Sequence, residues 1–327
     1  MYKDNDFLYE SIYQLENLIK RNIEVNSTRP EYDAVLSFFE EQFVVCLKAD
    51  IRNSNFGMIL GAVNELRSNT SKPVVVVAKY ISKSIMNEFR ERNINYIDVS
   101  GNAFISYRSI FVFIDGQKRK TTEKKNQSRA FQETGIKIIF YLLNNQDFLM
   151  KSYREIAEET GVSIGSVSNV MKELEELNFI VKTQTKRVLK NKKELLEKWM
   201  FSYNDVLRPR IFRKRMKFIG NESNGFRINN NNREVCLSGE TAASILTNNL
   251  RPEKHIIYTQ LPLSELSKEY KMIPDEHGNI DVYQKFWNIN SFNSSQLAPK
   301  LLVYTDLMNS GFGRNIEIAQ MIGLDGI

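Results

Sequence analysis

Four polar side chains recur at intervals of three residues in one short stretch of the sequence, and they have the chemistry of DNA base recognition. They are Ser163, Ser166, Asn169 and Lys172. In a helix they form one stripe of short donors and acceptors that ends in a cation, opposite the apolar residues Val167, Val170 and Leu174. Such a helix can enter the major groove, where an Asn side chain makes a bidentate contact to adenine. We predict these four residues as contacts to DNA bases.

The surrounding segment, 153–190, has the pattern of a helix-turn-helix followed by a wing. Ala157 is small enough for the second helix to cross closely over it, and Gly161 can take the positive φ of a sharp turn. After the second helix, residues 179–181 and Arg187–Leu189 are predicted as the two strands of a short basic hairpin. The segment is therefore predicted to be a winged helix-turn-helix domain. The alternative is a winged domain that binds only protein.

The positive charge of the chain is concentrated around this motif. The chain has 45 Lys and Arg against 39 Asp and Glu, but residues 116–220 contain 23 basic and 12 acidic residues, a local net charge of +11. A DNA backbone attracts such a segment in a salt-dependent way. We predict seven backbone contacts, from the wing and from the segment beyond it: Lys182, Lys186, Arg187, Lys190, Arg208, Arg210 and Arg213.

Length and composition set further bounds. With 327 residues and 42% hydrophobic content, the chain can fill two or three domain cores. The sequence begins MYKDNDFLYE, which has neither the basic nor the apolar region of a signal peptide, and it contains no apolar run of membrane-spanning length. Cys46 and Cys236 lie in separate hydrophobic runs and are expected as buried free thiols. We expect a cytoplasmic protein without a cofactor, a metal or a membrane partner.

The order of the expected elements indicates an α/β (α+β) protein with four parts. Residues 1–115 alternate strands and helices, which predicts a mixed sheet covered by helices. Residues 116–129 are a charged linker, 130–200 the winged domain, and 201–327 a C-terminal α/β domain. In that last domain we predict strands near 235–237, 255–258 and 301–304, helices near Gly239–Thr247 and Gly313–Ile322, and a polar loop at 220–233.

No catalytic constellation stands out. The chain has two histidines, His255 and His277, and neither has a second ligand at metal-binding spacing. Lys48, Asp50 and Asp98 loosely resemble a restriction-endonuclease-like sheet, which needs two carboxylates and a lysine around Mg²⁺. The usual spacing of those residues is missing, so a degenerate, inactive sheet domain is preferred and Asp98 is better explained by a turn after a strand. A metal-dependent DNA-processing enzyme remains the alternative to a non-enzymatic protein.

Four segments resemble one known family. They are 76–105 (VVAKYISKSIMNEFRERNINYIDVSGNAFI), 153–174 (YREIAEETGVSIGSVSNVMKEL), 238–259 (SGETAASILTNNLRPEKHIIYT) and 301–322 (LLVYTDLMNSGFGRNIEIAQMI). Together, and in this order, they resemble the AbiEi antitoxins, the transcriptional-regulator halves of type IV toxin–antitoxin (abortive infection) systems, in their longer, Bacteroidetes-type branch. One departure is Leu237–Ser238, where that family tends to have Trp or Gly.

The resemblance implies two roles. The winged domain would bind the operator of its own operon and repress it. The C-terminal domain would oppose a nucleotidyltransferase-like toxin without forming a stable complex with it, and a homodimer is left open. Arg251, Asp306 and Arg314 lie beside predicted ends of strands or helices and are the candidates for the antitoxin surface. Equally, they are candidates for salt-bridged structural groups.

Overall fold

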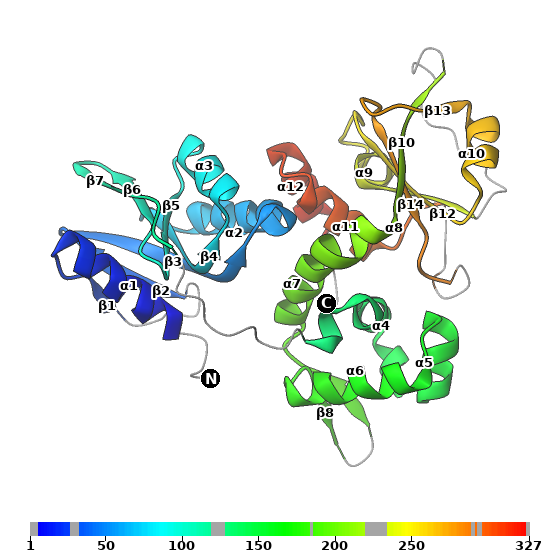
Figure 1. Ribbon diagram of the computed structural model, residues 1–327, viewed down its shortest axis with the longest axis horizontal. Helices are drawn as coiled ribbons and strands as arrows, with labels where there is room; N and C mark the ends of the chain where they lie inside the picture. The colour runs from blue at the N-terminus through cyan, green and yellow to red at the C-terminus, as the bar shows by residue number, and fades with distance from the viewer. Residues whose placement is uncertain are drawn as a thin grey trace. The chain divides into compact units, whose positions relative to one another are not determined.

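The structure is a computed structural model that describes residues 6–26, 33–118, 128–183, 186–219, 234–288, 292 and 296–324. It divides into two compact units, Met1–Glu123 and Lys124–Ile327 (Figure 1). The mixed α/β architecture predicted from the sequence is confirmed. The predicted loop 220–233 and most of the predicted linker, residues 119–127, lie outside the described residues. The predicted boundary at residue 200, which falls inside the second unit, stays a prediction.

The first unit is a seven-stranded sheet whose strands lie side by side in sequence order. They are β1 (Glu24–Asn26), β2 (Ala34–Phe38), β3 (Glu41–Ile51), β4 (Val74–Ile81), β5 (Asn95–Asp98), β6 (Ala103–Tyr107) and β7 (Ile110–Ile114). The pairs β3–β4 and β4–β5 are parallel, and the others are antiparallel. Helices α2 (Phe56–Asn69) and α3 (Lys83–Glu91) make the two parallel crossovers. The mixed sheet covered by helices that the sequence predicts for residues 1–115 is present.

Helices cover both faces of the sheet at β4, so this strand is buried on both faces. Val75 and Val77 pack in a cluster with Leu8, Ile12 and Leu15 of α1 (Asp6–Ile19), while α2 and α3 pack on the other side of the parallel strands (Figure 1). Because successive side chains of a strand point to opposite faces, a strand between two helical layers must be apolar at every position. The run VVVV that begins β4 meets that requirement.

The second unit begins with four helices and a hairpin. They are α4 (Glu133–Asn144), α5 (Tyr153–Thr160), α6 (Ile164–Glu176), β8 (Ile180–Lys182) paired antiparallel with β9 (Arg187–Leu189), and α7 (Lys192–Ser202). Short 3₁₀ turns at Arg129–Phe131 and Gln146–Met150 flank α4. The apolar side of α4 packs against α6 and α7, and the Trp199 indole of α7 donates to the Ile136 carbonyl at 2.9 Å. Trp199 is fully buried and stacks on Phe140.

One continuous helical segment leads from this bundle to a second sheet. A π-helical turn, Tyr203–Leu207, follows α7 directly and is itself followed by α8 (Arg208–Ile211). The sheet that comes next has the order β11-β12-β14-β10-β13, and only β12–β14 is parallel. Its strands are β10 (Phe212–Phe218), β11 (Val235–Ser238), β12 (His255–Thr259), β13 (Met272–Pro274) and β14 (Ile280–Gln284).

Four helices complete the C-terminal part: α9 (Gly239–Thr247), α10 (Leu263–Tyr270), α11 (Lys300–Asn309) and α12 (Gly313–Ile322). α9, α11 and α12 pack on one another, and α10 covers a cluster that includes Met216, Ile257 and Val282. The predicted helices α9 and α12 and strands β11 and β12 are confirmed. The predicted strand at 301–304 is wrong, because these residues lie in α11. The run LLVY is buried through Val303, so it has no apolar–polar period that separates a helix from a strand.

Candidate nucleic-acid interface

The predicted recognition helix α6 is preceded by a turn that local contacts hold in place. At the start of α5, Ser152 Oγ accepts the N–H of Glu155 at 3.3 Å, and the Glu155 carboxylate accepts the N–H of Ser152 at 2.7 Å. The helix ends at Gly161, whose φ of +68° lies in the left-handed region. The hydroxyl of Ser163 then caps α6 by accepting the Ser166 N–H at 3.2 Å. These contacts set the path of the chain from α5 into α6.

The two faces of α6 differ in the way that the sequence predicted. Its inner face consists of buried apolar side chains: Val167, Val170, Met171 and Leu174. Of the predicted base contacts, Ser163, Asn169 and Lys172 are exposed, and Ser166 is half-buried. The structure therefore brings the predicted polar stripe together on the outer face of one helix. Their contact with DNA stays a prediction.

The four side chains of that stripe differ in how free they are. Ser163 is engaged as the cap and also donates its hydroxyl hydrogen to Ser166 Oγ at 2.9 Å. Lys172 Nζ lies 3.8 Å from the Glu176 carboxylate, an exposed pair that contributes little. The Asn169 amide makes no hydrogen bond within the described residues. Asn169 is therefore the side chain best able to form new bonds with a ligand.

Some of the residues predicted to contact the DNA backbone from the β8–β9 hairpin are exposed, and one is half-buried. Lys182 pairs with Glu175 at 3.0 Å, and Lys186 is exposed at the tip, where Thr183 bonds to its backbone. Lys190 is exposed as well. Arg187, in contrast, stacks over the ring of Tyr153 at 4.8 Å and is half-buried. Arg187 thus fastens the hairpin to α5.

The three predicted arginines beyond α7 have different surroundings. Arg210 is exposed and lies 3.1 Å from Glu133, and Arg213 donates to the Leu261 carbonyl at 2.7 Å. The Arg208 side chain is only 17% exposed and lies 3.5 Å from the Asp306 carboxylate. Its guanidinium also lies 4.9 Å above the Tyr283 ring. Arg208 is directed into the protein, which corrects its prediction as a contact to the DNA backbone.

Asp306 is the centre of a buried network rather than part of a surface. Its carboxylate accepts the Ser238 hydroxyl at 2.6 Å and the Tyr258 hydroxyl at 3.0 Å, besides pairing with Arg208. The Tyr258 hydroxyl in turn lies 2.6 Å from that of Tyr203 in the π-helical turn. Burial raises the pKa of both tyrosines well above the ordinary value, so both remain protonated. The network joins the helical segment after the bundle to α11 and to strands β11 and β12.

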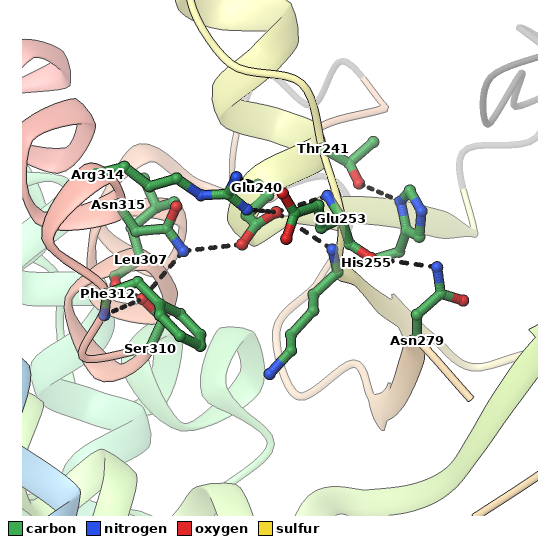
Figure 2. A network of polar contacts seen from close by, with 11 residues as sticks. Glu240, Thr241, Glu253, His255, Asn279, Leu307, Ser310, Phe312, Arg314 and Asn315 are labelled. Atoms are coloured by element: carbon green, nitrogen blue, oxygen red, sulfur yellow. Dashed lines mark hydrogen bonds and ion pairs between the residues drawn. The ribbon is translucent and has the colours of Figure 1, made fainter. Parts of the chain in front are cut away.

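A second network surrounds Glu240 at the start of α9 (Figure 2). One Glu240 carboxylate oxygen accepts the backbone N–H of Glu253 at 2.7 Å and that of Lys254 at 3.2 Å, and it also accepts an Arg314 N–H at 3.2 Å. The other oxygen accepts the Asn315 amide at 2.9 Å. Burial alone raises the pKa of Glu240, but the bonds from Asn315 and the two backbone groups, with the charge of Arg314, lower it overall.

The structure separates the three residues predicted as the antitoxin surface. Asp306 is 3% exposed, so its place on a surface is wrong. Arg314 is exposed but bonds to Glu253 and Glu240 across the α9–α12 contact (Figure 2). Arg251 is exposed. The alternative reading, that these are salt-bridged structural groups, therefore describes Asp306 and Arg314.

In the first unit, Asp98 is used for structure. Its carboxylate accepts the N–H groups of Ser100 and Asn102, each at 2.9 Å, and the Asn102 amide at 2.8 Å. Asp98 is 2% exposed at the end of β5. These bonds form the turn that the sequence predicted after this strand.

Two family models match the second unit. Residues 187–326, from β9 through α12, match the family described as transcriptional regulator, AbiEi antitoxin, type IV toxin–antitoxin system. This match supports an AbiEi-type antitoxin or regulator over these residues. Residues 132–199, from the start of α4 into α7, match the model of the Firmicute plasmid replication protein RepL. No curated protein and no solved structure matches the chain.

Both polar networks belong to the AbiEi-type region, together with Tyr203 and Arg208. Ser238, which directly precedes α9, donates its hydroxyl hydrogen to the Asp306 carboxylate. Sequence reasoning missed Glu240 and Tyr258. Glu240 had one available signal, an acidic residue in the first turn of a predicted helix, but such a residue is usually exposed. Tyr258 gave none, because a Tyr in an apolar strand is typical of any core.

No helix in the described residues of this AbiEi-type chain is both long and apolar enough to span a membrane.

Proposed function

We propose that this protein is a sequence-specific DNA-binding regulator that represses its own operon and acts as the antitoxin of a type IV toxin–antitoxin system. The AbiEi match over residues 187–326 supports a transcriptional regulator and antitoxin in general. The DNA-binding part of the proposal is supported by the exposed polar face of α6. This helix follows a turn, is capped by Ser163, and presents Asn169 and Lys172 to solvent. A regulator of an operon acts on DNA in the cytoplasm.

In this proposal α5 and α6 are the helix-turn-helix and β8–β9 is the wing. α6 enters the major groove, where Asn169 reads an adenine and Ser166 and Lys172 flank it. Lys182, Lys186 and Lys190 contact phosphates from the wing, with Arg210 beyond α7. Arg187 supports the wing through Tyr153. Arg213 is held by the Leu261 carbonyl and contributes charge more than a direct bond.

The test of DNA binding compares the full-length chain with Asn169→Ala on the region upstream of its operon and on a scrambled duplex. A bidentate contact contributes about 1–3 kcal/mol to base discrimination, so operator affinity should fall about 5-fold to 150-fold, with little change on the scrambled duplex. Asn64→Ala is the matched control, because Asn64 is exposed on α2 of the first unit. Equal losses on both duplexes would show that Asn169 does not read bases. No binding by the wild-type chain would favour the protein-binding alternative.

The antitoxin part places protection in the AbiEi-type region, against a nucleotidyltransferase-like toxin encoded beside this gene and without a stable complex. A chain shortened near Lys217 is unsuitable for testing it, because β10 is an inner strand and Met216 is fully buried. Full-length variants avoid this damage. Asn169→Ala should still protect cells from the neighbouring toxin while it fails to repress. If Asn169→Ala loses protection to the same extent as repression, the two roles are not separate.

Arg251 is the exposed residue retained from the predicted protective surface, and Arg251→Ala tests it. The expected result is weaker protection at an unchanged melting temperature. Unchanged protection would remove this residue from the proposed surface.

A further inference from the structure

The outer edge of the first unit's sheet is an unusual strand. β7 has the sequence IFVFI, with no charged residue, no proline and no glycine, and it is the last strand in the order of its sheet. Phe111 is 70% exposed and Phe113 is 47% exposed. Edge strands of soluble proteins normally carry charges, prolines or bulges that prevent pairing with another chain. An apolar edge without these features can pair with another strand.

The two faces of β7 are covered unequally. Ile110, Val112 and Ile114 pack with the cluster beneath α1. On the other face, α2 and α3 pack on β3, β4 and β5 and leave the β6–β7 hairpin to extend beyond them (Figure 1). There, Phe111 touches Phe104 edge-on, and Arg90 of α3 lies 4.8 Å above the ring of Phe113. The exposed rings thus form the end of an aromatic row beside the last strand of the sheet, as far as the described residues show it.

The pairing of β6 with β7 determines which backbone groups point outward. The strands are joined by the two-residue turn Arg108–Ser109, so Tyr107 and Ile110 are the first hydrogen-bonded pair. Because such pairs alternate in an antiparallel ladder, Val112 and Ile114 also bond toward β6. The N–H and C=O groups of Phe111 and Phe113 then point away from β6. The outer edge offers two sets of backbone donors and acceptors, placed symmetrically about Val112.

We propose that β7 pairs antiparallel with β7 of a second copy of this chain, about a two-fold axis at Val112. In that register Phe111 of each copy lies opposite Phe113 of the other, on the same face, and their outward backbone groups satisfy one another. Arg108, which pairs with Glu41 at 2.6 Å, stands before the strand, and Asp115, which lies 4.0 Å from Arg90, stands after it. In this register the strand ends bring residues of opposite charge together, so like charges do not oppose the pairing. Both sheets join into one, and the apolar edge is covered.

The biological purpose of this dimer rests on the proposed function, because a two-fold dimer of a repressor suits a palindromic operator. The dimer itself is tested without DNA. Full-length Val112→Cys should form a disulfide-linked dimer under mild oxidation. At the two-fold axis, Val112 faces its own copy in a non-hydrogen-bonded pair with Cα atoms about 4.5 Å apart. The native cysteines are buried and do not compete.

Phe111→Cys is the matched control, because residue 111 faces residue 113 of the other copy and should crosslink much less. Sedimentation should show a dimer for the wild-type chain and a monomer for Phe111→Lys/Phe113→Lys, whose exposed positions make the change compatible with folding. Circular dichroism checks that this variant is folded. A wild-type chain that sediments as a monomer, or equal crosslinking of the two cysteine variants, would overturn the proposal. DNA binding can fail while the dimer persists, so the two conclusions are separable.

Discussion

Removing the Glu240 carboxylate should destabilise the second unit far more than removing the arginine that pairs with it. Glu240 is 4% exposed and accepts four hydrogen bonds, whereas the Arg314 side chain is 41% exposed. In Glu240→Ala, the amide of Asn315, a residue 1% exposed, loses its acceptor and keeps only its bond to Ser310 at 3.0 Å. Arg314→Ala leaves the Glu240 carboxylate its other three donors.

The size of the effect depends on which partners water can reach. Hydrogen bonds to charged groups contribute about 1.5–3 kcal/mol each. Glu253 and Lys254 are exposed, so water can replace part of what their N–H groups lose. We expect Glu240→Ala to lower the free energy of unfolding by about 3 kcal/mol. Arg314→Ala removes the exposed pair with Glu253 and one of the four donors to Glu240. Because the Arg314 side chain is 41% exposed, water can take its place, and the change should cost about 0–1 kcal/mol.

Glu240→Gln refines the prediction, because it keeps the shape and one acceptor for the two backbone N–H groups. Its new amide N–H₂ would face Asn315, whose Oδ1 has no hydrogen-bond partner in the described residues. Rotation of the Asn315 amide then pairs the two side chains. Glu240→Gln should therefore cost about 1 kcal/mol, the size of one neutral hydrogen bond.

Tryptophan fluorescence during urea unfolding measures these stability differences for the second unit of the chain, which contains Glu240. The chain has two Trp residues, Trp199 and Trp287, and both are buried in the second unit. A loss of about 3 kcal/mol corresponds to a fall in melting temperature of roughly 6–12 °C for a unit of this size. If Arg314→Ala costs as much as Glu240→Ala, or Glu240→Ala costs less than Glu240→Gln, then this reasoning about burial and bond count is wrong.

Three further predictions concern pH, salt and backbone packing. The pKa of Glu240 is lowered in the folded protein, so its stabilisation is present above its ordinary value of 4.5 and is lost as pH falls through the folded value. As pH is lowered, the unfolding midpoint should therefore decline less steeply for Glu240→Gln than for the wild-type chain, and parallel curves would contradict this. Lys182→Ala/Lys186→Ala should make the slope of log affinity against log salt shallower by about 0.9 for each phosphate that is no longer neutralised, whereas Lys268→Ala on α10 should leave it unchanged. A Cβ at Gly135 would lie 2.1 Å from the Ala130 carbonyl oxygen, while one at Gly165 on α6 meets nothing within 4 Å. Gly135→Ala should lower the melting temperature, and Gly165→Ala should raise stability by about 0.5–1 kcal/mol; a lower melting temperature for both would contradict the packing argument.

The sequence alone determined features that depend on local chemistry. Gly161, Ser163 and the apolar spacing from Val167 to Leu174 define a turn and a one-sided helix, and these signals act over a few residues. The mixed sheet of residues 1–115 was readable as well, because strands that alternate with helices along the chain favour a sheet covered by those helices. Asp98 was correctly assigned to a turn, since an Asx bond reaches only a few residues along the chain.

Only the tertiary structure decided the role of each charged side chain. Arg208 and Asp306 both looked like exposed residues beside element ends, one for DNA and one for an antitoxin surface. They lie 98 positions apart and meet because α8, which follows the π-helical turn, packs on β14, while α11 packs on β11 of the same sheet. Residues 301–304 show the same limit, since a run buried on every side has no period. Burial and pairing between distant segments are properties of the packed chain, and no local pattern encodes them.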